Sequence, residues 1–334
     1  MSRASRAKAI AQAAAVGGAG LVGAGGAMYG VLIGQSRLAR RRIGTPSEAL
    51  FDPSGTYGDD SLTSADPVRL ALLGDSGAAG FGVDEAEDTT GAVIASLLAA
   101  AIDRPVQLQC WAVVGAQSED LPGQIAQALP FQPHAAVIMV GANDVTNRVT
   151  PGRSVALLTD AVRQLLAADI QVVVGTCPDL GTVRPIPHPL KWIARHWSRS
   201  LAAAQTVAVV VAGGRTVALA DLLGEEFDTH PDTMFGPDRF HPSAAGYRAV
   251  AAALVPSLTE LIGDSPGAGS PTPRATTAHL AVERAAAAAV EVGGAEVLAD
   301  ANQTASASWH RRTLRAVLRR PPGDSVKAEG SVLG

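Results

Sequence analysis

The sequence predicts an α/β domain with a flavodoxin-like, three-layer architecture: a five-stranded parallel sheet in the strand order 2-1-3-4-5, covered by helices on both faces. Short apolar segments alternate with segments whose apolar residues recur at helical spacing, which is typical of strand–helix–strand units. The strand segments are apolar almost throughout, which indicates a sheet that is buried on both faces. Five such segments within about 200 residues fit a doubly wound sheet.

The expected elements begin at residue 68 and end at residue 262. The first apolar run closes with Gly74, and Ser243 follows Pro242 at a position that suits the N-cap of the last helix. The expected strands are residues 68–74, 106–114, 135–141, 170–175 and 215–220. The expected helices are residues 89–102, 154–168, 189–211 and 243–262.

Composition divides the chain into four segments. Residues 264–277 are rich in Pro, Gly, Ser and Thr, which favours a linker, and residues 309–320 form a short basic amphipathic stretch. The expected segments are a basic and apolar N-terminal segment at 1–45, a linker at 46–66, the α/β domain at 67–263, and a linker with an Ala-rich tail at 264–334.

The N-terminal segment leaves the location of the protein open. Residues 9–34 carry no charge, a length that could span a bilayer, and basic residues flank the run on both sides. The run predicts either an uncleaved membrane anchor or a cleaved signal peptide, so that the protein is membrane-anchored or secreted. A peripheral or soluble segment, and with it a cytoplasmic protein, is the alternative.

Charge and cysteine usage exclude several classes of function. Residues 43–263 carry 24 acidic and 12 basic side chains, so this body repels phosphate backbones and we expect no nucleic-acid partner. Two cysteines are too few for a disulfide scaffold or a cysteine zinc site. The seven histidines show no metal-ligand spacing, so we expect neither a metal nor another cofactor.

Polar residues and glycines follow three of the expected strands and precede the last helix. Because the carboxyl ends of parallel strands meet at one edge of a sheet, these segments are expected to form a single site. They are Gly74-Asp75-Ser76-Gly77, Val114-Gly115-Ala116-Gln117-Ser118, Gly141-Ala142-Asn143-Asp144 and Asp238-Arg239-Phe240-His241-Pro242-Ser243.

The residue types in these segments suit nucleophilic catalysis. Ser76 needs a base within hydrogen-bond reach, for which His241 is the candidate, and Asp238 can orient the histidine ring. The backbone N–H groups of Ser76 and Gly115 and the side chain of Asn143 could form an oxyanion hole. We expect a glycine at 115 because a side chain there would crowd the acyl group. Asp75 and Asp144 are expected to be turn and capping residues.

The four segments resemble, in order, the signature blocks of the SGNH (GDSL-type) hydrolases, over roughly residues 67–263. The resemblance implies the SGNH hydrolase fold, the same roles for the matching residues, and hydrolysis of carboxylic esters as in lipases and esterases. An ordinary α/β-hydrolase is the weaker alternative. Its elbow reads G-x-S-x-G, whereas this chain has Ala78 at the last position.

The substrate is not specified by these motifs. We expect a small-molecule, lipid or acylated-glycan ester, with a preference for short acyl chains. Trp192 and Trp197 could line an acyl pocket, and the alternative is that both pack their helix onto the sheet. An acyltransferase with the same triad and a non-enzymatic, membrane-tethered binding module are the other functions that stay open.

Overall fold

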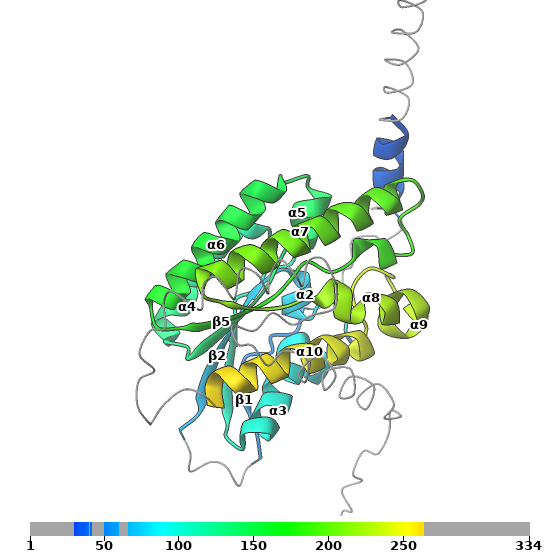
Figure 1. The fold of residues 1–334 in the computed structure, drawn as a ribbon. Helices are drawn as coiled ribbons and strands as arrows, with labels where there is room; N and C mark the ends of the chain where they lie inside the picture. Colours follow the sequence, from blue (N-terminus) through cyan, green and yellow to red (C-terminus); the bar gives the residue numbers. More distant parts are fainter. Residues whose placement is uncertain (1–29, 40, 42–49, 60–65, 264–334) are drawn as a thin grey trace, which may run out of the picture.

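A computed structural model describes residues 30–39, 41, 50–59 and 66–263 (Figure 1). The expected linker at 264–277 and the basic stretch at 309–320 lie outside the described residues, as does most of the uncharged run at 9–34. Within the described ranges, no helix combines the length and the apolar character that a bilayer crossing requires.

The sheet has six strands in the order β1-β3-β2-β4-β5-β6. The last five are parallel and keep the predicted order. The expectation of five strands was wrong, because β1 adds an antiparallel edge strand beside β3 from the segment expected to be a linker. The strands are β1 Gly55–Tyr57, β2 Val68–Gly74, β3 Val106–Cys110, β4 Ala135–Met139, β5 Gln171–Gly175 and β6 Arg215–Val217.

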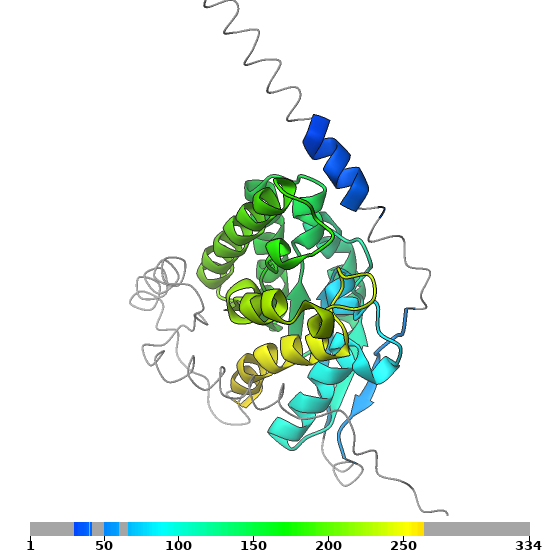
Figure 2. The same ribbon diagram turned by 90° about the vertical axis from the view of Figure 1, so that its right-hand side faces the viewer.

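Helices cover both faces of this sheet (Figures 1 and 2). One face packs against α3 and α10, and the other packs against α4, α6 and α7. The helices are α2 Ser76–Ala79, α3 Thr90–Ile102, α4 Leu121–Ala128, α5 Ala142–Thr146, α6 Pro151–Ala167, α7 Leu190–Ala212, α8 Leu219–Thr229, α9 Pro231–Met234 and α10 Ala244–Gly263. Single 3₁₀ turns lie at Ala86–Asp88, Ser118–Asp120, Leu129–Phe131 and Leu180–Thr182.

The alternation of side chains along β2 shows why its sequence is continuously apolar. Leu70 and Leu72 pack into the core on the α3–α10 side. Ala71 and Leu73 pack into the core on the α4–α6 side. Because successive side chains point to opposite faces, a strand between two helical layers needs apolar residues at every position.

Several predicted boundaries differ from the structure. The strand expected at 106–114 ends at Cys110, although Trp111 N and Val113 N still donate to the carbonyl groups of Leu72 and Gly74 (2.9 and 3.0 Å). The strand expected at 215–220 ends at Val217, because α8 begins two residues later. The prediction named none of the helices α4, α5, α8 and α9.

A helix at residues 30–39 lies beside the start of α7 (Figure 1). The Gln35 side chain donates to the carbonyl oxygen of His188 (2.6 Å) and accepts from the backbone N–H of Leu190 (3.1 Å). These two hydrogen bonds fix the helix to the loop that precedes α7.

Candidate active site

The turn from β2 into α2 holds Ser76 at the carboxyl end of a central strand. Gly74 has φ +133°, and a side chain there would overlap the Met139 carbonyl group of β4, so the turn requires a glycine. The Asp75 side chain accepts from the backbone N–H of Gly77 (2.9 Å) and caps α2. Ser76 is therefore the first residue of α2, and its side chain faces the loop before α10.

A chain of hydrogen bonds joins Ser76 to the loop before α10. His241 Nε2 lies 3.0 Å from Ser76 Oγ, and His241 Nδ1 lies 2.6 Å from Asp238 Oδ2. Asp238 Oδ1 also accepts from the backbone N–H groups of Phe240 and His241 (2.8 and 2.9 Å). The structure thus brings together the three residues that the sequence singled out, although Asp238 and His241 are more than 160 residues from Ser76 along the chain.

The electrostatics of Asp238 favour a charged carboxylate. Burial acts to raise its pKa, but the hydrogen bond from the His241 ring and those from the backbone outweigh this effect, so the pKa lies below its usual value. A carboxylate at this position holds a proton on His241 Nδ1. The other ring nitrogen, Nε2, is then the acceptor that faces Ser76 Oγ.

Two phenylalanines hold the histidine ring from the sides. Phe81 and Phe240 each contact His241 edge-on, with ring centroids 4.9 Å apart. The buried Tyr247 donates its hydroxyl hydrogen to the Phe81 carbonyl oxygen (2.7 Å), which fixes that segment to α10. Sequence reasoning missed Phe81, because no local pattern ties residue 81 to residue 241.

The candidate oxyanion residues lie on two neighbouring loops. Asn143 Nδ2 donates to the carbonyl oxygen of Ala116, the residue after Gly115 (3.1 Å). Gly115 has φ +86°, and a side chain there would meet no protein atom within 4 Å. The backbone conformation therefore accounts for this glycine, rather than crowding by the surrounding protein.

A buried carboxylate joins the same two loops. Asp144 accepts from the Ser118 backbone N–H (3.0 Å), from the Ser118 hydroxyl (2.5 Å) and from the Ser154 hydroxyl (2.6 Å). It is completely buried. The expectation that Asp144 is a turn or capping residue was wrong, since this side chain links three segments, whereas Asp75 does cap a helix.

Comparison with known proteins identifies the family of this site. The sequence model of the GDSL-like Lipase/Acylhydrolase family matches residues 72–249, just over half of the chain. The chain belongs to this family. The matched range contains every residue of the Ser76–His241–Asp238 chain and both candidate oxyanion loops.

Individual relatives of this GDSL-like protein include a curated protein and several solved structures. The chain is 43% identical over 197 residues to the GDSL-like esterase Rv1075c of Mycobacterium tuberculosis, which covers 58% of this chain and 63% of that protein. The match thus spans less than two thirds of the relative. Among solved structures, the psychrotrophic esterase EstA from Pseudoalteromonas sp. is 18% identical over 59% of this chain and 100% of that one (TM-score 0.47). The lipase/acylhydrolase from Enterococcus faecalis is 20% identical over 57% and 95% (TM-score 0.45).

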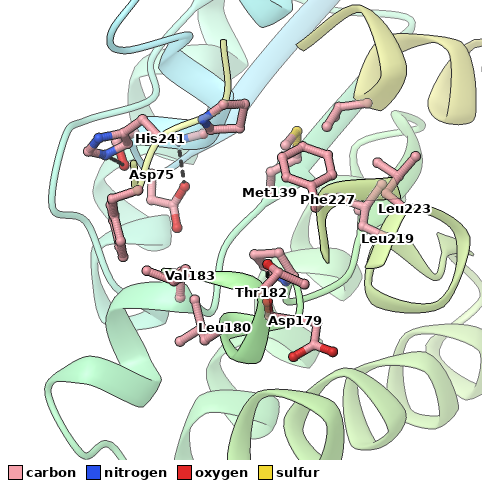
Figure 3. Close-up of a pocket in the computed structure, with 18 of the residues that line it drawn as sticks. Asp75, Met139, Asp179, Leu180, Thr182, Val183, Leu219, Leu223, Phe227 and His241 are labelled. Carbon is pink, nitrogen blue, oxygen red and sulfur yellow. Dashed lines mark hydrogen bonds between the residues drawn. The ribbon is translucent and has the colours of Figure 1, made fainter. Parts of the chain in front are cut away.

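An apolar cavity of this GDSL-like domain opens at Ser76 and His241 (Figure 3). The space between its atoms, including the open mouth, measures about 850 Å³. Its apolar lining comes from the end of β4, the turn at 180–182, α8 and the segment before α10. The main apolar lining residues are Met139, Leu180, Leu219, Leu223, Phe227 and Phe235.

The two tryptophans expected at an acyl pocket do not line this cavity. Trp192 is 67% exposed and stacks on His196 along the outer surface of α7, and Trp197 is 46% exposed. Both the expected pocket role and the alternative packing role are corrected by this exposure. Position along a helix could not reveal it, because α7 buries only one of its faces.

The cysteines and the candidate metal ligands add no further chemistry to the site. Cys110 and Cys177 are free thiols, and burial raises the pKa of Cys110 to about 11. In the part of the chain that the structure describes, no three His, Cys, Asp or Glu side chains form a group that could hold a metal ion.

Asp75 is expected to make the stability of the protein depend on pH. Burial raises its pKa to about 6, while the Gly77 N–H and the charge of His241 oppose this effect. Because the folded pKa lies above the unfolded value, the native protein binds the proton more tightly between about pH 4 and pH 6. The free energy of unfolding therefore falls with rising pH across this window, by on the order of 3 kcal/mol for this group.

The Asp75→Asn variant isolates this effect, because an amide oxygen can still accept from Gly77 while the charge is absent. We expect the stability of the variant relative to the wild type to increase between pH 4 and pH 7. Urea unfolding of both proteins at several pH values measures the difference. The same pH dependence in both proteins would show that Asp75 is not the group responsible.

Proposed function

We propose that this protein is a carboxylic ester hydrolase that works through an acyl-enzyme on Ser76. The observation that carries the proposal is the hydrogen-bonded chain Ser76 Oγ–His241–Asp238 at the mouth of an apolar cavity. Membership of the GDSL-like lipase/acylhydrolase family and the 43% identity to a GDSL-like esterase support the same activity.

In the first half of the reaction, His241 Nε2 takes the proton of Ser76 while Oγ attacks the ester carbonyl carbon. Asp238 stabilises the imidazolium that forms. The tetrahedral intermediate then collapses, the bond to the alcohol oxygen breaks, and His241 gives its proton to the leaving alcohol. The acyl group remains bonded to Ser76 Oγ.

The negative oxygen of the intermediate needs donors that are already in place. The backbone N–H of Ser76 at the start of α2, the backbone N–H of Gly115 and the amide of Asn143 are the candidates. The Asn143–Ala116 hydrogen bond and the Asp144 contacts support this role, because they hold the two donor loops against each other. Water, activated by His241, then attacks the acyl-enzyme, and the carboxylic acid leaves.

Pre-steady-state kinetics with p-nitrophenyl acetate test the proposal against its alternatives. The full chain should release p-nitrophenolate in a burst equal to the enzyme concentration, followed by slower turnover. Adding an alcohol and analysing the products then separates a hydrolase, which forms acetate, from an acyltransferase with the same triad, which forms a new ester. Neither burst nor turnover would favour a non-enzymatic binding module.

The activity is expected to depend on pH through the base. A histidine base must be neutral to accept the serine proton, so kcat/KM should fall as the pH drops below about 6–7. Asp238 does not contribute to this decline, because its lowered pKa keeps it ionised over the whole range. A pH–rate profile that is flat from pH 5 to pH 8 would contradict the role of His241.

We also propose that the protein is membrane-anchored or secreted. The uncharged run at residues 9–34 supports this location, and Trp192 and Trp197 give the outer surface of α7 an exposed aromatic character that suits a membrane interface. Cell fractionation together with sequencing of the mature N-terminus tests it. Full-length protein found only in the soluble cytoplasmic fraction would contradict the proposal.

A further inference from the structure

The cavity beside Ser76 is closed on the side away from the catalytic residues. The Asp179 carboxylate lines it there and is bound by Arg195 and Arg199 of α7 (Nε to Oδ2, 3.3 and 3.2 Å). The Asp179 side chain is only 4% exposed, and its other oxygen accepts from the Gly181 backbone N–H (2.7 Å). The negative charge at this wall is thus compensated by the two arginines.

The two ends of the cavity therefore differ in chemistry. Ser76 and His241 lie at the mouth, and apolar side chains from α8 and from the end of β4 line the interior (Figure 3). A volume of several hundred Å³ with mostly apolar walls is typical of a site for a small apolar ligand. A polar or sugar-like group would lose its hydrogen bonds to water inside such a cavity.

We propose that this cavity binds the acyl chain of the ester, so that an aliphatic acyl group is the substrate class. The inference rests on the proposed function, because it places the carbonyl carbon at Ser76 Oγ. The acyl group stays bonded to Ser76 through both halves of the reaction, so a closed cavity suits it. The alcohol has to leave, and water has to enter, through the open mouth.

The glycine at residue 224 gives a direct way to narrow the cavity. Gly224 lies inside α8 and lines the cavity, and a Cβ there would meet Asp179 Cβ at 3.8 Å and Oδ2 at 3.9 Å, which are ordinary contacts. A leucine at this position can therefore be accommodated and occupies part of the cavity. Leucine also has a higher helix propensity than glycine, so the substitution is compatible with α8.

The wild type is expected to favour longer acyl chains until the cavity is full. Each added methylene should raise kcat/KM about fourfold, which corresponds to burial of one CH₂ group at about 0.8 kcal/mol. In Gly224→Leu, kcat/KM for p-nitrophenyl hexanoate should fall at least about tenfold relative to that for the acetate. Gly224→Ala should shift the ratio in the same direction by less.

Gly123→Leu is the matched control, because Gly123 is an exposed glycine of α4 whose Cβ would meet no atom within 4 Å. It should leave the hexanoate-to-acetate ratio unchanged. Circular dichroism and thermal unfolding establish that each variant is folded, and Gly224→Ala keeps the test valid if Gly224→Leu is not.

Two results would overturn the inference while leaving the esterase in place. One is an unchanged hexanoate-to-acetate ratio in the folded Gly224 variants. The other is an effect confined to alkyl acetates of increasing alcohol length, which would assign the cavity to the alcohol. Absence of wild-type turnover with every ester would instead overturn the proposed function.

Discussion

Ser76→Ala is expected to lower kcat for an activated ester by about 10⁶-fold, because no other group can form the acyl-enzyme. Ser76 Oγ is the atom that His241 Nε2 faces at 3.0 Å, and removing it leaves the base without a partner. The oxyanion donors and the cavity remain, so a small residual rate above the uncatalysed reaction is expected. Initial rates with p-nitrophenyl acetate measure the loss.

Ser200→Ala is the matched control for this variant, because Ser200 is an exposed serine of α7 remote from the triad. It should hydrolyse the ester at the wild-type rate. Equal rates in Ser76→Ala and the wild type would mean that the hydrolysis is background, and the binding-module alternative would then be favoured.

Asp238→Asn should lower kcat by about 10⁴-fold while the protein stays folded. The carboxylate holds the proton on His241 Nδ1 through a 2.6 Å contact, and a neutral amide can neither stabilise the imidazolium nor enforce this tautomer. The amide oxygen can still accept from the backbone N–H groups of Phe240 and His241, so the loop is expected to keep its conformation.

The comparison of kcat with KM distinguishes this role from a structural one. In Asp238→Asn, KM should change little, since the cavity and the oxyanion donors are untouched. Asp160→Asn, which removes an exposed carboxylate of α6, should leave both parameters unchanged. Turnover of Asp238→Asn within about tenfold of the wild type would remove Asp238 from the triad.

The parallel part of the sheet could be predicted because its signals are local. Residues 68–74 form one apolar run that ends in a glycine, and the structure has β2 at those residues. The helix expected at 89–102 is α3, which begins one residue later. Burial on both faces imposes continuous apolarity on the strands, and one buried face imposes helical spacing on the helices.

The edge strand could not be predicted in the same way. β1 is only three residues long, and its side chains are exposed or half-buried, so it has neither an apolar run nor a clear alternation. It exists because residues 55–57 pair with 106–108 of β3, a contact across about 50 residues. The geometry of such a pair depends on the tertiary structure, which local propensity does not encode.

The candidate site shows the same division. The four motif segments identified Ser76, Asp238 and His241, which the structure places in hydrogen-bond contact. The apolar cavity was not predicted, because its walls come from separate elements, each of which resembles ordinary core sequence. The outward orientation of Trp192 was missed for a related reason, since a tryptophan in an amphipathic helix normally lies on the buried face.

Reaction with a fluorophosphonate tests most directly whether Ser76 is an activated nucleophile. The full chain would be treated with the reagent, digested and analysed by peptide mass spectrometry. One phosphonyl group on the peptide that contains Ser76, and none in Asp238→Asn under the same brief treatment, is the predicted result. An unlabelled wild type, or a label on a different residue that leaves ester hydrolysis intact, would contradict the account.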